Sequence, residues 1–401
     1  MNTVDTAPPS AAPAAQVPSH ADRGEARAAV GVVVDSTAMI RGTAAAALSA
    51  RLEGRFAVVD LHVEVDPDPA AEAPSTPDAP VTSAEGGDDA GDAGADAESA
   101  GDPVSLPDSA WDAATLCRAM DAGRGVRTSM PSSADFVHAI RSVLDAGADQ
   151  VVVLTLSAEL SGTHGSAIAA AGGVREVAPV HVVDSRTTSA VLAAATRAAV
   201  TRAEAGGSID QVVRAAQDVL DTGSAIAFVP ADLVHLQRGG RIGAAASLLG
   251  KALSIVPVLT LESGAVATVG TVRTRKRAVT RLARTVVQRA VEIREDRASQ
   301  DGADGTDVEH GSDVGTFDGR TPWTPAFVLV HSEDVPAPGE EPVADVPALD
   351  MALRQEAVAA GLVGEPTELV VHEDVLSTVI TAHVGPGALG VAVVPAEYTA
   401  G

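Results

Sequence analysis

Residues 151–171 read VVVLTLSAELSGTHGSAIAAA, and this stretch decides the fold class of the chain. The unbroken apolar run Val151–Leu156 predicts a buried strand. A polar turn that begins at Ser157 follows it, and the small apolar residues after the turn predict a helix over Gly165–Ala171. A strand that passes through a short polar turn into a helix is the repeating unit of parallel α/β sheets.

The same pattern recurs on both sides of this stretch. Two other short apolar runs end in polar turns: Val30–Val34 before Asp35, Ser36 and Thr37, and His181–Val183 before Asp184 and Ser185. Helices are predicted between the strands, at Ala134–Ala146 and Ala190–Ala205. The alternation predicts a parallel sheet with helices on both faces, and ligands of such sheets bind beyond the carboxyl ends of the strands.

The second half of the chain has a different pattern. Two strand-like runs joined by Glu262-Ser263-Gly264 indicate a β-hairpin, and a helix is predicted around Leu349–Ala360. The predicted strands are Ser254–Leu261, Ala265–Arg273, Ala326–His331, Leu369–His372, Val379–Val384 and Gly390–Val394. We therefore expect two α/β domains, 29–221 with a parallel sheet and 222–401 with a mixed sheet, with the boundary near Asp221–Gly223.

Charge is distributed unevenly along the chain. The net charge is −26, but residues 66–102 hold 11 acidic side chains and no Lys or Arg, and residues 295–320 hold 8 acidic side chains against 2 arginines. We predict disordered acidic insertions at 66–105 and 295–322 and a disordered tail at 1–28, because such compositions bury too little apolar surface to fold. Residues 238–284 are the reverse, with nine Lys and Arg against Glu262, which predicts a surface for phosphate or an acidic partner.

Several classes of protein are excluded by composition. The single cysteine, Cys117, rules out an intramolecular disulfide and a cysteine zinc cluster, and no metal site is expected. The start of the chain lacks the pattern of a secretory signal, and no run of 18 apolar residues predicts a membrane span, so we expect a soluble cytoplasmic protein. Gly250-Lys251 is not a P-loop, because Gly243 is too distant and Ala252 replaces Ser or Thr.

Four motifs carry hydroxyl, imidazole or guanidinium groups. In Thr128-Ser129-Met130-Pro131-Ser132, Ser132 with Asp135 reads as a helix capping box, which leaves Thr128 and Ser129 unexplained. Leu160-Ser161-Gly162-Thr163 either caps the next helix or forms an anion site at its N-terminus. Arg238 and Arg241 flank the tight turn Gly239-Gly240, which is either a solvated turn or a binding loop. His383 precedes Gly385-Pro386-Gly387, where its ring is expected to project at a chain reversal.

The order of these motifs resembles the DegV family, whose members bind fatty acids and in several cases serve as the fatty-acid-binding subunit of bacterial fatty-acid kinase. The motifs that match the family pattern are Asp35–Ala38, Thr128–Ser132, Leu160–Thr163, Asp184-Ser185, Gly239–Ile242, Val272–Ala278 and His383–Gly387. The resemblance covers about Ala29–Val394 apart from the acidic insertions. Met130 departs from it, since the family often has Gln there.

The resemblance implies a role for each motif. The acyl chain would be buried between the sheet and helices of the first domain. Its carboxylate would be bound by Thr128 and Ser161, with His383 oriented against the Thr128 hydroxyl. The implied carboxylate site is Thr128, Ser129, Ser161, Gly162 and His383; the implied pocket turns are Asp35, Ser36, Thr37, Asp184 and Ser185; and the implied contacts to a kinase subunit or phosphoryl group are Arg238, Arg241 and Arg275.

The function implied by the resemblance is binding without catalysis. The chain would hold a long-chain fatty acid as its ligand, use no cofactor, and present the carboxylate to a partner acyl kinase that makes acyl phosphate for phospholipid synthesis. A serine hydrolase using Ser161, His383 and Asp35 or Asp184 is the main rival, but Ser161 lacks the G-x-S-x-G elbow. Nucleic-acid binding is disfavoured because aromatic residues for base stacking make up only 2% of the chain.

Overall fold

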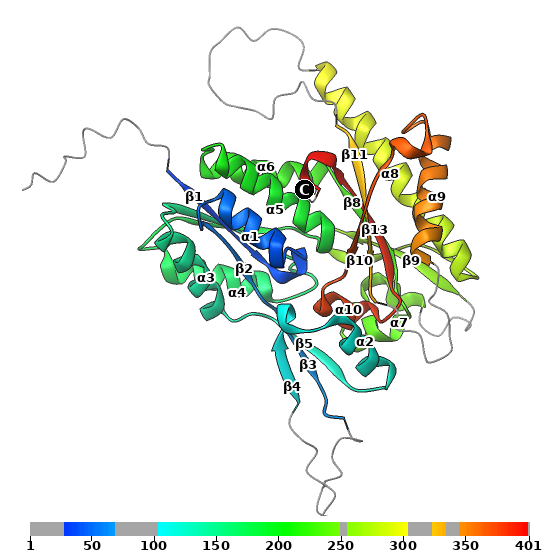
Figure 1. Cartoon of the computed structure of the whole chain (residues 1–401), viewed down its shortest axis with the longest axis horizontal. Coiled ribbons are helices and arrows are strands. Elements are labelled where there is room, and N and C mark those ends of the chain that lie inside the picture. The colour runs from blue at the N-terminus through cyan, green and yellow to red at the C-terminus, as the bar shows by residue number, and fades with distance from the viewer. Residues whose placement is uncertain (1–27, 69–102, 249–254, 304–322, 334–344, 400–401) are drawn as a thin grey trace, which may run out of the picture.

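The computed structural model describes residues 28–68, 103–248, 255–303, 323–333 and 345–399, and it confirms the predicted α/β class with a parallel sheet and a mixed sheet (Figure 1). The predicted tail and most of both predicted acidic insertions lie outside these residues. At their edges the predictions of disorder were wrong, because Val104–Pro107 form strand β4 and helix α8 extends to Ala303.

The first sheet is parallel and has the order β2-β1-β6-β7. Its strands are Phe56–Val59, Val30–Asp35, Gln150–Thr155 and Val180–Asp184, for β2, β1, β6 and β7 respectively. Alternate residues of the central strands face opposite sides, as the two-residue repeat of a strand requires. Val33 and Val153 pack with helices α3 (Ser133–Asp145) and α4 (Thr163–Val174), so these helices cover one face.

The other face of the first sheet packs on α1 and α5. Val32 and Leu154 belong to a core that includes residues of α1 (Gly42–Arg51) and α5 (Ser189–Glu204). Helix α6 (Ile209–Thr222) lies against α5 in Figure 1 and begins with a Ser208–Gln211 capping box. This core continues without a break into the second half of the chain, so the two sheets share one hydrophobic interior.

A small antiparallel unit projects from the first sheet, and we call it the lobe. It comprises β3 (His62–Val65), β4 (Val104–Pro107), the turn Asp108–Ala110, α2 (Ala113–Asp121) and β5 (Val126–Ser129), with the strand order β4-β3-β5. Figure 1 shows the lobe below the first sheet and next to the short helix α10. The lobe therefore carries Thr128 and Ser129 to a place where they meet elements of the second half.

The second sheet is mixed and has the order β10-β9-β8-β13-β11-β12. Its strands are Ala265–Val272, Val256–Glu262, Ala225–Val229, Leu389–Pro395, Pro325–His331 and Val370–Val375, for β10, β9, β8, β13, β11 and β12 respectively. Only β11 and β12 pair in parallel. One face packs on α8 (Arg275–Ala303) and α9 (Asp345–Ala359), whereas the other faces the core shared with the first sheet.

Two short helices lie between this sheet and the lobe. They are α7 (Leu233–Arg238), which starts at the N-cap Asp232, and α10 (Thr378–Val384), which starts at the N-cap Ser377. The sequence pattern predicted a strand at Val379–Val384, and this prediction was wrong. The apolar, partly β-branched run fits a strand locally, but Ser377 and a distant carboxylate cap the segment as a helix. Within the described residues, no helix is both long and apolar enough to cross a membrane.

Candidate functional site

A cavity of about 380 Å³ lies where the first sheet, the lobe and the second sheet meet. Its wall takes Thr37 and Leu156 from the ends of the first sheet's strands, Thr128 from the lobe, and Phe228 and Val330 from the second sheet. The resemblance implied a chain-binding space between the first sheet and its helices. There the described structure instead has closely packed Val, Ala and Leu side chains, and the cavity opens between the two sheets.

The floor of the cavity is apolar and contains a glycine in a central strand. Gly390 of β13 pairs with Phe228 of β8 on one side and with Val330 of β11 on the other. A Cβ on Gly390 would lie 3.0 Å from Val330 Cγ2 and 3.2 Å from Phe228 Cβ. The absence of a side chain at this position therefore leaves space above the strand, between two apolar neighbours.

Polar groups gather at one part of the cavity wall. Thr128 ends strand β5 and His383 lies in the last turn of α10, and Thr128 Oγ1 is 2.9 Å from His383 Nε2. Burial lowers the pKa of His383 to about 4, with a further contribution from the positive charge of Arg241. The imidazole is therefore neutral near pH 7, and one of its nitrogens carries the only ring proton.

Ser161 comes to the same wall from the loop between β6 and α4. Its Oγ lies 2.8 Å from Thr163 Oγ1 and accepts a hydrogen bond from Thr163 N at 3.3 Å. Gly162 is the N-cap of α4 and has no side chain of its own to cap the helix. A Cβ on Gly162 would lie 2.5 Å from Sδ of the exposed Met130 side chain, so the residue after β5 lies against the start of α4.

The structure thus brings together the five residues predicted for the carboxylate site. Thr128, Ser129, Ser161, Gly162 and His383 all line the cavity. They come from the lobe, the first sheet and α10, three parts of the chain that are distant in sequence. The arrangement offers three hydroxyl groups, a neutral imidazole and the N-terminus of a twelve-residue helix, which together suit an anionic oxygen.

The predicted turn at the end of β1 supports the cavity from behind. Asp35 is fully buried and accepts hydrogen bonds from Thr37 N at 3.0 Å, Thr37 Oγ1 at 2.6 Å and Leu156 N at 2.5 Å. Burial raises the pKa of Asp35 to about 6 although these hydrogen bonds oppose the shift. Ser36 Oγ accepts from Leu61 N at 3.1 Å. Of these three turn residues, only Thr37 lines the cavity.

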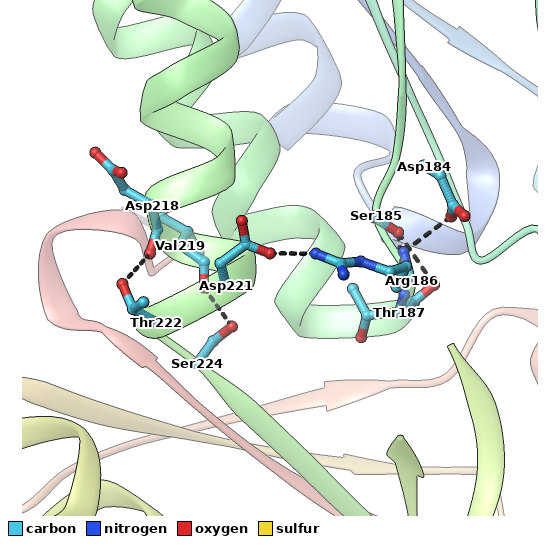
Figure 2. A network of polar contacts seen from close by, with 9 residues as sticks. All are labelled: Asp184, Ser185, Arg186, Thr187, Asp218, Val219, Asp221, Thr222 and Ser224. Carbon is cyan, nitrogen blue, oxygen red and sulfur yellow. Dashed lines mark hydrogen bonds and ion pairs between the residues drawn. The ribbon is translucent and has the colours of Figure 1, made fainter. Parts of the chain in front are cut away.

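The second predicted turn, at the end of β7, lies elsewhere. Asp184 Oδ1 accepts from Arg186 N at 2.9 Å, and Ser185 Oγ donates to Thr187 O at 3.2 Å. Figure 2 shows Arg186 extending from this turn to an ion pair with Asp221 near the end of α6. Neither Asp184 nor Ser185 lines the cavity, so these two residues fix the turn before α5 rather than contact the space inside.

A second, polar chamber of about 560 Å³ adjoins the cavity and shares Thr128, Arg241 and His383 with it. Four arginines line this outer chamber, namely Arg124, Arg127, Arg238 and Arg241, and no carboxylate is among its described lining residues. The sequence motifs did not reveal Arg124 and Arg127, which belong to none of them. The only sequence feature that could have indicated them is their position shortly before the Thr128 motif.

The predicted arginines have different surroundings. Arg241 donates through Nε to Leu160 O at 2.8 Å and through Nη1 to Gly239 O, so it also fixes the loop that carries Ser161. Arg238 lines the outer chamber and forms no ion pair with any described residue. Arg275 does not line either space. It pairs with Asp345 at 2.6 Å and donates to Gly387 O, and so anchors the loop after α10.

The hydrogen bonds do not assemble a hydrolase triad from the described residues. His383 Nε2 faces Thr128, whereas the Ser161 hydroxyl faces Thr163. Asp35 is occupied by Thr37 and Leu156 and makes no hydrogen bond to a histidine. In the same described part of the chain, no group of three or more His, Cys, Asp or Glu side chains is placed to hold a metal ion.

Comparison with protein families gives one match, over residues 101–300, to the family described as "Uncharacterised protein, DegV family". A DegV domain-containing protein of Deinococcus radiodurans is 32% identical over 284 residues, which cover 70% of this chain and 82% of that relative. One of Streptomyces coelicolor is 42% identical over 177 residues, 44% of this chain. One of Clostridium acetobutylicum is 36% identical over 169 residues, 41% of this chain. The matched segments span 62% and 57% of these last two relatives.

Solved structures share the whole fold. A fatty-acid-binding DegV family protein of Thermus thermophilus matches with a TM-score of 0.61 and 24% identity, over 92% of this chain and 99% of that one. DegV of Bacillus subtilis, described as a fatty acid binding protein, matches with a TM-score of 0.58 and 19% identity, over 92% and 99% of the two chains. At these identities the similarity establishes the common arrangement of sheets, lobe and helices.

Proposed function

Since the chain belongs to the DegV family, we propose that its cavity binds a long-chain fatty acid, with the carboxylate at Thr128 and Ser161 and the alkyl chain over the floor at Gly390. The observation that carries the proposal is the pairing of an apolar floor with one polar wall in a single cavity. The fatty-acid-binding DegV proteins of T. thermophilus and B. subtilis support the choice of ligand.

The energetics favour an alkyl chain as the occupant. Burial contributes about 0.8 kcal/mol per methylene, so a dozen methylenes contribute on the order of 10 kcal/mol before the costs of association. A carboxylate in the same space would be destabilised unless it accepts hydrogen bonds. The Thr128 and Ser161 hydroxyls supply such donors, and the guanidinium of Arg241, which also lines the cavity, donates to Leu160 O and Gly239 O.

The proposed binding requires one direction for the hydrogen bond between His383 and Thr128. For the Thr128 hydroxyl to donate its single proton to a carboxylate, that proton must not already be donated to His383 Nε2. His383 meets this need when its Nε2 carries the ring proton and donates to Thr128 Oγ1 across the 2.9 Å contact. The low pKa of His383 keeps the ring neutral near pH 7, and the proposed binding then requires the tautomer with its proton on Nε2.

We infer further that the chain does no chemistry on the acid and presents its carboxylate to an acyl kinase in the cytoplasm, so that acyl phosphate forms for phospholipid synthesis. The outer chamber supports this step, because its four arginines lie where a phosphoryl group would join the carboxylate at the Thr128 wall. Arg238 and Arg241 are the expected contacts to phosphate or kinase. Arg275 would act indirectly by holding the Gly387 loop.

Native mass spectrometry of the chain purified from a bacterial host tests the binding. We expect a bound fatty acid in the wild type, and loss of most of it in Thr128→Val and Ser161→Ala. Arg238→Gln is the matched control, because Arg238 lines only the outer chamber and should retain the lipid. Wild-type protein that is purified without a bound lipid and takes up neither oleate nor palmitate would rule out the proposal.

The kinase step needs a separate assay. With a bacterial acyl kinase and ATP, Arg238→Gln should hold oleate as the wild type does and yield less acyl phosphate. Arg241→Gln is less informative, because Arg241 also holds the Ser161 loop through Leu160 O. Equal acyl phosphate from wild type and Arg238→Gln would remove Arg238 from this step and leave fatty-acid binding intact.

A further inference from the structure

Helix α10 is held to the lobe at both of its ends. In its last turn, His383 contacts Thr128 of β5. At its first turn, Asp108 of the lobe accepts hydrogen bonds through Oδ1 from Thr378 N at 2.9 Å, Thr378 Oγ1 at 2.5 Å and Val379 N at 3.3 Å. The helix between these two contacts also forms cavity wall, through Val379 and its neighbours.

The N-terminal N–H groups of α10 need hydrogen-bond acceptors from outside the helix. A helix has four such groups without intrahelical acceptors, and buried ones must find an acceptor elsewhere. Ser377 satisfies one of them locally, since its Oγ accepts from Ile380 N at 3.2 Å, and its carbonyl accepts the first intrahelical bond, from Thr381 N at 2.9 Å. The N–H groups of Thr378 and Val379 remain, and Asp108 takes both.

Asp108 is placed for this contact by the lobe itself. Its side chain is 3% exposed, and its backbone N–H donates to Leu61 O at 2.8 Å, next to the cavity wall. No cation among the described residues forms an ion pair with it, so the buried carboxylate is stabilised by the donors at the start of α10. The cap therefore fixes α10 relative to the lobe, whereas Ser377 alone would cap the helix in any position.

We propose that Asp108 is a positioning residue for the carboxylate site: it holds α10 on the lobe so that His383 meets Thr128 in the orientation needed to donate to it. The proposal rests on the proposed fatty-acid binding. Asp108 does not line the cavity. Its effect passes along α10, whose residues 378 and 383 lie about 7.5 Å apart along the helix axis.

The chain offers a matched control in the same lobe. Asp112 is the N-cap of α2 and accepts from Thr115 N at 2.8 Å and Thr115 Oγ1 at 2.6 Å, the same pattern that Asp108 makes with Thr378. Asp112 is exposed, and its side-chain hydrogen bonds and ion pair are with Thr115 and Arg118 of its own helix. Asp112→Ala therefore removes an equivalent helix cap without disturbing the link between the lobe and His383.

Fluorescent fatty-acid binding to full-length variants tests the proposal. We expect Asp108→Ala to weaken binding about tenfold, as for the loss of one hydrogen bond to a charged group, and Asp112→Ala to stay within about twofold of wild type. Asp108→Asn keeps an acceptor for all three donors and should restore most of the affinity. Wild-type affinity in Asp108→Ala, or an equal loss in Asp112→Ala, would overturn the proposal.

A second measurement separates this proposal from the fatty-acid proposal. In ¹⁵N spectra of ligand-free protein, His383 should give the Nε2–H tautomer in wild type and Asp108→Asn and lose this signature in Asp108→Ala. An unchanged His383 signal in Asp108→Ala would refute the positioning role even if the wild type bound no fatty acid. If Asp108→Ala does not fold, Thr378→Val removes only the hydroxyl contact with Asp108, which is 2.5 Å long. This variant should shift the His383 signal and weaken fatty-acid binding several-fold. An unchanged signal and an unchanged affinity would refute the positioning role.

Discussion

Replacement of His383 should change how the stability of the chain depends on pH. Burial lowers the pKa of His383 to about 4 in the folded chain, from an ordinary value of 6.5. Between these two values the unfolded chain binds a proton that the folded chain does not. The stability contributed at His383 is therefore fully present above pH 6.5 and is lost as the pH falls toward 4. The two pKa values correspond to a loss of about 3 kcal/mol.

Asp35 has the opposite effect in an overlapping range. Burial raises its pKa from 3.8 to about 6, so the folded chain binds this proton more readily than the unfolded chain. Stability from Asp35 is present below pH 3.8 and is lost as the pH rises through 6, again by about 3 kcal/mol. The two effects oppose one another in the wild type, and only variants reveal them.

Urea denaturation of wild type and His383→Gln at pH 7 and pH 4 measures the effect. The substituted amide can donate to Thr128 but does not titrate, so the free energy of unfolding of wild type minus variant should fall by about 3 kcal/mol between these pH values. The same difference for Asp35→Asn should change in the opposite direction. A difference for His383→Gln that stays constant, or rises as the pH falls, would refute the neutral imidazole.

Two other predictions concern glycines. Gly390→Ala should weaken binding of long fatty acids more than short ones and destabilise the chain by about 1–3 kcal/mol, because the added Cβ would lie 3.0 Å from Val330 Cγ2. Equal loss of affinity for all chain lengths in a competition series would contradict this prediction. Gly264→Ala should destabilise the chain by about 1–3 kcal/mol in urea denaturation, since Gly264 has φ +89° and its Cβ would lie 2.4 Å from Ser157 Oγ; unchanged stability would show that the β9–β10 hairpin tip is not fixed there.

The parallel sheet and its helices could be predicted because their signals are local. Runs such as Val151–Leu156 are buried on both faces, and Ser132 with Asp135 forms the expected capping box. Helix α10 was mispredicted because its residues favour a strand locally and two of its N–H groups are capped from the lobe by Asp108. A contact between residues 270 positions apart leaves no local signal in a single sequence.

The site residues that belong to motifs at strand ends could be predicted from the sequence. The site residues whose position depends on tertiary packing could not. Thr128 and Ser161 line the same cavity, and one lies near the end of β5 whereas the other lies in the loop between β6 and α4. Arg124 lines the outer chamber but was not predicted, because it belongs to no motif and only the fold of the lobe places it there. The cavity was expected within the first domain, but it lies between the two sheets. The periodicity of each sheet's strands does not encode how the two sheets pack against one another.

A crystal structure of the chain with oleate would test the carboxylate site most directly. The proposed binding mode predicts a carboxylate oxygen within about 3.2 Å of both Thr128 Oγ1 and Ser161 Oγ, with the alkyl chain over Phe228 and Gly390. A carboxylate bound instead at the Asp184–Thr187 turn, or an alkyl chain lying between the first sheet and α5, would contradict it.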